Sequence, residues 1–217
     1  MNKNASITVA AALAASLAAV PATAHNTFSS MTAPAGYVQD LEMRITHGCK
    51  GSPVNSVRIK IPEGVTRVSV HVARDWKVET KMRKLPKPVQ GEGGNTITET
   101  VDEIMWSAPK SAIPASGSYE GFRFRAQLPN TPGAILFFKT INGCEKGDEP
   151  YIDLPKTPLP AVGAAGFGQK LIDFMAATPG PAPYLILEKP AKPQYPWGTA
   201  TPSSRKGAGA GAIAGAH

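Results

Sequence analysis

Short segments in which apolar and polar residues alternate recur along most of this 217-residue chain. An alternation with a period of two places one face of a strand in a core and the other face in water. The clearest case is Val38 to Ile45, where Leu41, Met43 and Ile45 alternate with charged residues. Proline and glycine interrupt such segments at short intervals. The pattern predicts an all-β chain folded as an antiparallel, immunoglobulin-like β-sandwich.

The expected strands combine this alternation with flanking turn residues. They are 38–45, 57–61, 68–72, 76–82, 96–106, 122–126, 135–138, 151–154 and 184–187. The stretch from Lys84 to Asn95 holds two prolines and three glycines, which predicts a loop. Apolar residues at helical spacing within Gly166 to Ala177 predict one short helix late in the chain, packed on the sandwich.

The first 24 residues have the layout of a secretory signal peptide. One positive charge precedes an Ala-rich apolar run, and Ala22-Thr23-Ala24 forms a small-residue cleavage site. A membrane anchor is the alternative, but the run is shorter than the roughly 20 residues that span a bilayer. No later run is long enough, so we expect no transmembrane segment in the mature chain. Cleavage after Ala24 would make His25 the first residue of an exported protein.

We therefore divide the chain into a signal peptide at 1–24, one sandwich domain at 25–188 and a tail at 189–217. The tail is rich in Pro, Gly and Ala, cannot bury a core, and is expected to be disordered. The formal charge of +7 is concentrated outside the domain, and removing five basic residues of the signal and tail leaves about +2. No dense basic run carries interleaved aromatic residues, so nucleic acid is not an expected partner.

Cys49 and Cys144 are the two cysteines of the chain. An even number of cysteines in an exported protein favours a disulfide. A bridge between them would tie early strands to late ones and contribute about 4 to 5 kcal/mol by constraining the unfolded chain. The alternative is a pair of thiolate metal ligands, which an oxidising compartment disfavours.

An N-terminal histidine is a chelator before any fold is added. The free α-amine and the ring Nδ1 of His25 can close a ring on one metal ion, and such nitrogen pairs suit Cu(II) best among common divalent ions. The alternative is that cleavage happens to leave a histidine there. Of the other histidines, His47 lies in a turn beside Cys49 and is expected to make a structural hydrogen bond. His71 is expected to be solvated, and His217 belongs to the tail.

Several motifs resemble those of the YcnI-like copper-binding family. They are Ala24-His25, Ala33-Pro34-Ala35-Gly36, His47-Gly48-Cys49-Lys50-Gly51-Ser52-Pro53 and Ile61-Pro62-Glu63-Gly64-Val65, with further matches at 75–78, 103–106, 144–147 and 181–183. The resemblance covers residues 24 to 188. It implies an exported β-sandwich of the periplasm or cell envelope that binds Cu(II) through one N-terminal histidine. It also implies a role in copper trafficking or homeostasis, beside periplasmic copper chaperones or a membrane copper transporter.

The resemblance implies further residues around His25. The family completes its copper site with a Glu on the first strand and a nearby Trp, and these positions fall on Gln39 and Tyr151. A neutral amide thus stands in place of a carboxylate, and a phenol in place of an indole. Glu149 is a candidate to supply the carboxylate, provided that the chain before Tyr151 turns inward.

Two other functions remain open. A copper-dependent oxidative enzyme would be favoured by a second histidine beside His25. No nucleophile–base pair stands out in the sequence, so we expect a protein that is not an enzyme. The other alternative is a non-catalytic envelope interaction domain that has lost metal binding, of which Gln39 and Tyr151 would be the trace.

Overall fold

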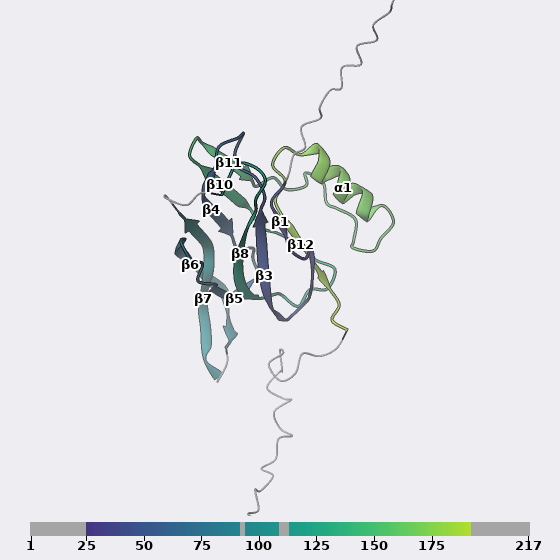
Figure 1. The fold of residues 1–217 in the computed structure, drawn as a ribbon. Helices are drawn as coiled ribbons and strands as arrows, with labels where there is room; N and C mark the ends of the chain where they lie inside the picture. Colours follow the sequence, from purple (N-terminus) through teal and green to yellow (C-terminus); the bar gives the residue numbers. More distant parts are fainter. Residues whose placement is uncertain (1–24, 92–93, 109–112, 192–217) are drawn as a thin grey trace, which may run out of the picture.

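Two antiparallel sheets pack face to face in the structure, a computed structural model that describes residues 25–91, 94–108 and 113–191. One sheet has the strand order β1-β3-β8-β5 and the other the order β11-β10-β4-β7-β6 (Figure 1). These strands are β1 (Thr27–Phe28), β3 (Val38–Ile45), β4 (Val54–Lys60), β5 (Thr66–Val70), β6 (Lys77–Gln90), β7 (Thr96–Ser107), β8 (Glu120–Gln127), β10 (Thr140–Cys144) and β11 (Asp148–Tyr151). The predicted β-sandwich is confirmed.

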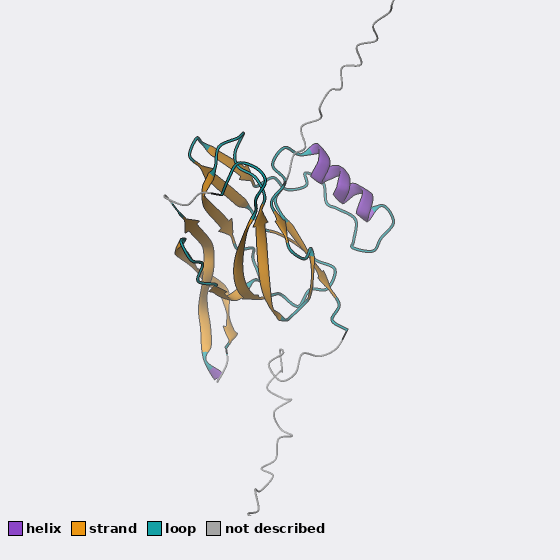
Figure 2. Ribbon diagram, in the orientation of Figure 1, coloured by secondary structure: helices purple, strands orange, loops and turns teal. Residues whose placement is uncertain are grey.

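A smaller sheet and one helix lie beside the sandwich (Figure 2). The sheet has the order β2-β12-β9, with β2 (Thr32–Pro34) parallel to β12 (Tyr184–Glu188) and β9 (Ile135–Phe137) antiparallel to it. The helix α1 (Phe167–Ala177) forms where helical spacing predicts it. No helix of the described residues is long and apolar enough to cross a membrane. The expected signal peptide and residues 192–217 of the expected tail lie outside the described residues.

The core is built from the inward faces of the two large sheets. On β3, Leu41, Met43 and Ile45 are all at most 7% exposed, while their neighbours along the strand are more accessible. Phe122 of β8 stacks against the fully buried Trp106 of β7, with ring centroids 5.2 Å apart. Strand alternation therefore sets the inside and outside of the sandwich, as the sequence predicts.

Two predicted boundaries are wrong, one of a loop and one of a strand. The expected loop at 84–95 belongs largely to β6, which runs to Gln90 as an edge strand. An edge strand tolerates its two prolines because one side of it makes no ladder hydrogen bonds. The strand expected at 151–154 lies earlier, as β11, and pairs with β10, which the sequence analysis misses. The β10–β11 hairpin turns directly after the second cysteine, the last residue of β10, and shapes the site below.

A cluster of charged side chains joins the β6–β7 hairpin to the end of β4. Lys60 Nζ donates to Asp102 at 2.6 Å and Arg83 Nη1 donates to the same carboxylate at 3.2 Å. These hydrogen bonds, the one from Lys60 foremost, hold the pKa of Asp102 below its usual range despite some burial. Arg83 also donates to the carbonyl oxygens of Ile61 and Pro62, at 2.6 and 2.8 Å.

The predicted disulfide is present. Cys49 and Cys144 are bonded, with Cα atoms 6.0 Å apart and a sequence separation of 95. Both residues are at most 8% exposed. The bridge joins the turn after β3 to the end of β10, so it fastens together two segments that both contribute to the candidate site.

Candidate metal centre

The first described residue, His25, is positioned by the short strand β1. Thr27 and Phe28 pair antiparallel with Arg44 and Met43, so β1 runs back along the end of β3. The chain before β1 and the chain after β3 therefore leave the sheet at the same end of their strands. This pairing brings His25 to the same end of the sandwich as His47, which follows β3 by two residues.

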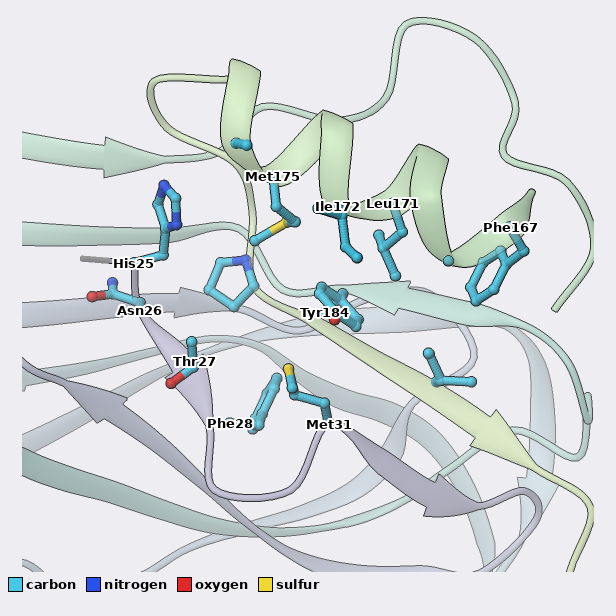
Figure 3. Close-up of a pocket in the computed structure, with 14 residues that line it drawn as sticks. His25, Asn26, Thr27, Phe28, Met31, Phe167, Leu171, Ile172, Met175 and Tyr184 are labelled. Carbon is cyan, nitrogen blue, oxygen red and sulfur yellow. The ribbon is translucent and has the colours of Figure 1, made fainter. Parts of the chain in front are cut away.

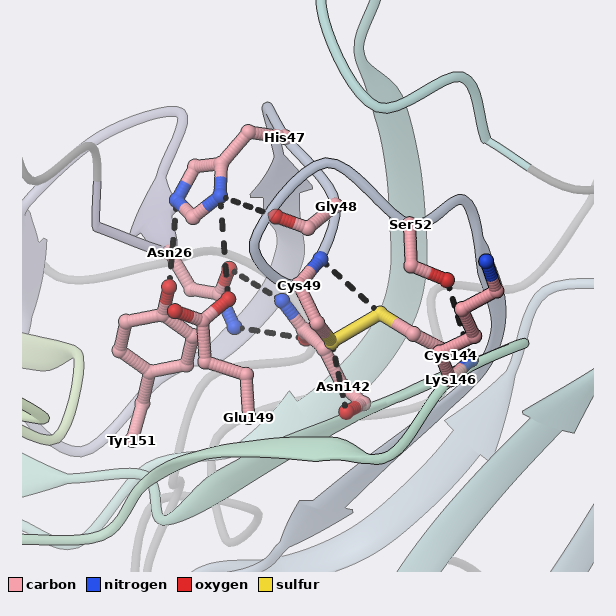
Figure 4. Close-up of a disulfide and its surroundings, with 10 residues drawn as sticks. All are labelled: Asn26, His47, Gly48, Cys49, Ser52, Asn142, Cys144, Lys146, Glu149 and Tyr151. Carbon is pink, nitrogen blue, oxygen red and sulfur yellow. Dashed lines mark hydrogen bonds and ion pairs between the residues drawn. A yellow bond between two sulfur atoms is a disulfide. The ribbon is translucent and has the colours of Figure 1, made fainter.

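The β10–β11 hairpin supplies the other side of this site. Asn142 pairs with Glu149 and Thr140 pairs with Tyr151 in its ladder. Gly143 precedes Cys144 on β10, and an added Cβ there would collide with the side chain of Ser56. Close packing of the hairpin on β4 thus requires glycine at this position. The hairpin carries Glu149 and Tyr151 up to the turn that holds His47 (Figure 4).

His47 makes contacts through both ring nitrogens. Its Nδ1 lies 2.9 Å from the carbonyl oxygen of Gly48 and 3.8 Å from Oε2 of Glu149. Its Nε2 lies 3.1 Å from the Tyr151 hydroxyl. A carbonyl oxygen only accepts, so Nδ1 carries a proton and donates to Gly48, while Nε2 and the Tyr151 hydroxyl form the second hydrogen bond. The expected structural hydrogen bond of His47 is present, and a second one joins it to the candidate ligand Tyr151.

Tyr151 lies between the two histidines. Its ring centroid is 6.3 Å from the ring of His25 and 6.3 Å from the ring of His47, with edge-to-face geometry in both pairs. Tyr151 is 2% exposed. Burial raises the pKa of its phenol, and the neighbouring Glu149 carboxylate raises that pKa further. The phenol therefore stays protonated and can serve as a hydrogen-bond donor throughout the physiological range.

His25 is held in its neutral form. Burial lowers the pKa of its imidazole, and the nearby His47 lowers it further. Neutral imidazole is the form that binds metals, because the lone pair is free of a proton. In the full sequence the α-nitrogen of His25 is bonded to Ala24, and the expected cleavage would free it.

Two buried polar atoms of this site have no hydrogen-bond partner among the described residues. They are Nε2 of His25 and Oε2 of Glu149. Burial of an unsatisfied polar atom costs about 1 to 3 kcal/mol, so such atoms are rare and call for an explanation. An imidazole and a carboxylate together form a donor set that fits a divalent transition metal.

An amide pair supports the floor of the site. Asn26 Nδ2 donates to Asn142 Oδ1 at 2.9 Å, and Asn142 Nδ2 donates to Asn26 Oδ1 at 3.1 Å. Both side chains are at most 1% exposed. This reciprocal pair fastens the residue after His25 to the middle of β10. It limits where the His25 backbone, and hence a freed α-amine, can lie.

The strand register places Gln39, which the resemblance implies as a ligand, away from this site. Gln39 pairs with Ala126 at the beginning of β3, five residues before Arg44. At about 3.3 Å per residue, this places Gln39 about 17 Å from the pairing that positions β1. Its side chain instead donates to the carbonyl oxygen of Val38, at 2.7 Å. Glu149, by contrast, contacts both His47 and Tyr151.

No cluster of three or more His, Cys, Asp or Glu side chains suited to a metal ion occurs in the described residues. The expected cleavage would add the α-amine of His25 as a further nitrogen donor. His25 and Glu149 would supply side-chain donors, while Tyr151 and His47 would orient them. The residues fit a copper ion better after processing than before it.

The fold is that of an immunoglobulin-like sandwich. The structure is similar to that of an uncharacterised Nocardia farcinica protein with an immunoglobulin-like fold, at 14% identity and a TM-score of 0.52, covering 76% of this chain and 99% of that one. A putative membrane anchored protein from Corynebacterium diphtheriae is also similar, at 12% identity and a TM-score of 0.33, covering 75% and 34%. No curated protein sequence matches the chain. A family model described as a domain of unknown function, DUF1775, matches residues 25–165, and the chain belongs to this family.

Neither the role of Asn142 nor the closeness of His47 to the site is predicted from the sequence. A usable signal was present, because Cys49 lies two residues after His47 and Cys144 two residues after Asn142. A disulfide holds its flanking segments together, so the predicted bridge already implies that the segments carrying His47 and Asn142 lie close to each other. What hid the site was the unpredicted strand β10.

Proposed function

We propose that the mature chain is an exported copper-binding protein that holds Cu(II) through the α-amine and imidazole of His25. The observation that carries the proposal is the pair of unsatisfied buried atoms on His25 and Glu149. The match of the family model from residue 25 onward supports it, as does the resemblance to the YcnI-like family. The buried disulfide supports export, because such bridges persist in oxidising compartments.

The carboxylate of Glu149 takes the place that the resemblance gives to Gln39. A carboxylate compensates the charge of a dication, whereas an amide does not. Glu149 is oriented by its contact with His47 Nδ1 and by its interaction with Tyr151. Neighbouring groups that orient a ligand in this way are worth about 10- to 100-fold in metal affinity.

The proposed activity is binding in copper trafficking or homeostasis rather than catalysis, with a copper chaperone or transporter as the partner. His47 uses both ring nitrogens in contacts with Gly48 and Tyr151. A second imidazole ligand, as in an oxidative two-histidine site, would require breaking the contact with Tyr151. The copper-loaded protein should therefore show no reductant-dependent oxygen consumption, and sustained turnover would favour the oxidative enzyme.

Titration of the processed protein with Cu(II), followed by electron paramagnetic resonance, tests the proposal. One ion should bind per chain, with nitrogen hyperfine structure from the amine and the ring. His25→Ala should abolish this signal, and one extra glycine before His25 should do the same by displacing the free amine. Glu149→Gln should weaken binding about 10-fold or more.

Two variants serve as matched controls. His71→Ala removes an exposed histidine that lines a different cavity, with Asp40 and Arg125. Gln39→Ala removes the residue that the strand register places away from the site. Both should bind Cu(II) as the wild type does. Binding that survives His25→Ala would overturn the proposal, and absence of any binding would favour the interaction domain.

A further inference from the structure

A cavity of about 680 Å³ lies between helix α1 and the strands β1 and β12 (Figure 3). His25 lines it, yet Glu149, His47 and Tyr151 do not. His25 is thus shared between two environments. One is the polar site described above, with its carboxylate, and the other is this mainly apolar cavity.

Two thioether groups face this cavity. Met31 lies in the turn between β1 and β2, and Met175 lies in the last turns of α1. Figure 3 shows both side chains directed into the space beneath the helix, with Met175 on the side of His25. Met31 is 47% exposed, so the core does not require it. Of the five methionines in the described residues, these two share the cavity with His25.

Soft sulfur ligands distinguish the two oxidation states of copper. Thioethers select Cu(I), whereas carboxylates suit harder ions, and imidazole serves both. Methionine is unbranched and adapts its conformation to a ligand. Helix α1 buries only Leu171 among its residues and has no side-chain hydrogen bond at its N-terminus, so little packing opposes a small adjustment of Met175.

We propose that this cavity is a binding site for Cu(I), with sulfur ligands from Met31 and Met175 and a nitrogen ligand from His25. The site rests on the proposed function, because His25 is common to both sites. Cu(II) is held toward Glu149, and Cu(I) is held toward the thioethers. The protein can then accept copper in either oxidation state from the same position.

The test measures Cu(I) directly, in the processed protein under anaerobic conditions with ascorbate. Competition with the chromogenic chelator bicinchoninate, followed by visible absorption, gives the affinity. The double variant Met31→Leu/Met175→Leu keeps side-chain volume and apolar character. It should lose at least about 10-fold in Cu(I) affinity, which is the lower bound for perturbing a metal site. The sulfur contribution to the copper X-ray absorption spectrum should disappear with it.

Met82→Leu is the matched control, because Met82 is 55% exposed on the edge strand β6. This variant should bind Cu(I) as the wild type does. Thermal unfolding of the double variant checks that it folds. Cu(I) affinity that is unchanged in a folded double variant would overturn the proposal, as would failure of the wild type to compete for Cu(I).

Cu(II) resonance spectra of the same samples separate the two proposals. An unchanged Cu(II) signal in the double variant, with weakened Cu(I) binding, is the expected result. If the wild type binds Cu(II) normally but does not compete with bicinchoninate for Cu(I), only the thioether site is refuted. Absence of Cu(II) binding in the wild type would refute the proposed function. The bicinchoninate competition then decides the Cu(I) site separately.

Discussion

Removal of the disulfide should cost this protein a large part of its stability. Cys49 and Cys144 close a loop with a sequence separation of 95, which includes β5 and β8 of one large sheet and β4, β6, β7 and β10 of the other. Cross-linking restricts the unfolded chain, and the loss of entropy grows with the logarithm of loop length. For a loop of this size the restriction corresponds to about 4 to 5 kcal/mol at 25 °C. A domain with a typical free energy of unfolding, about 5 to 15 kcal/mol, would therefore keep only part of its stability.

Urea denaturation of the oxidised and reduced processed protein measures this loss. With a slope of about 2 kcal/mol/M, the midpoint should fall by about 2 M on reduction. Reduced wild type keeps both sulfur atoms, so its loss reports the loop constraint. The Cys49→Ala/Cys144→Ala variant should fall slightly further, because both residues are buried and their sulfurs leave small cavities.

A midpoint shift below about 0.5 M would refute this reasoning, since it would mean that the unfolded chain gains little freedom when the bridge opens. Reduction also frees the turn that carries His47 from the hairpin that carries Glu149. We therefore expect Cu(II) affinity to fall on reduction even under conditions in which the reduced protein remains folded. Circular dichroism of the reduced sample establishes that the fold persists in that measurement.

Three further perturbations probe the supports of the site and the fold. Asn26→Ala should lower the free energy of unfolding by about 1 to 3 kcal/mol in urea denaturation, because it leaves the Asn142 amide buried without its partner. The double variant with Asn142→Ala should lose less than the sum of the two single losses. Asp102 has a lowered pKa, so its contribution to stability should be complete above pH 3.8 and disappear as the pH falls through that lowered pKa. Asp102→Asn should flatten this part of the plot of unfolding free energy against pH. An unchanged plot would contradict the role of this carboxylate. Gly48→Ala should destabilise the turn and weaken Cu(II) binding, since the added Cβ collides with the carbonyl of Ser52; a variant that melts and binds like the wild type would count against this close approach.

The architecture could be predicted from sequence because strand alternation reports burial directly. From Leu41 to Ile45, β3 buries every second residue, and the residues at 167–177 form the helix that their spacing predicts. The errors arise where local signals and tertiary context disagree. The prolines at 86 and 88 indicate a loop, yet an unpaired edge accommodates them within β6. The strand β10, Thr-Ile-Asn-Gly-Cys, is mostly buried and carries no alternation for a sequence pattern to detect.

The candidate site was predictable only in the parts that depend on local chemistry. His25 follows from the cleavage motif, and the bridge follows from the number of cysteines. Gln39 is implied as a ligand by the resemblance alone, and the register, which no sequence pattern supplies, places it at the end of β3 away from β1. The disulfide was the better guide, since it fixes the segments flanking Cys49 and Cys144 to one another. Within that constraint Glu149 is the carboxylate that reaches Tyr151 and His47, which makes Glu149→Gln the sharpest single test of how the coordination around His25 is completed.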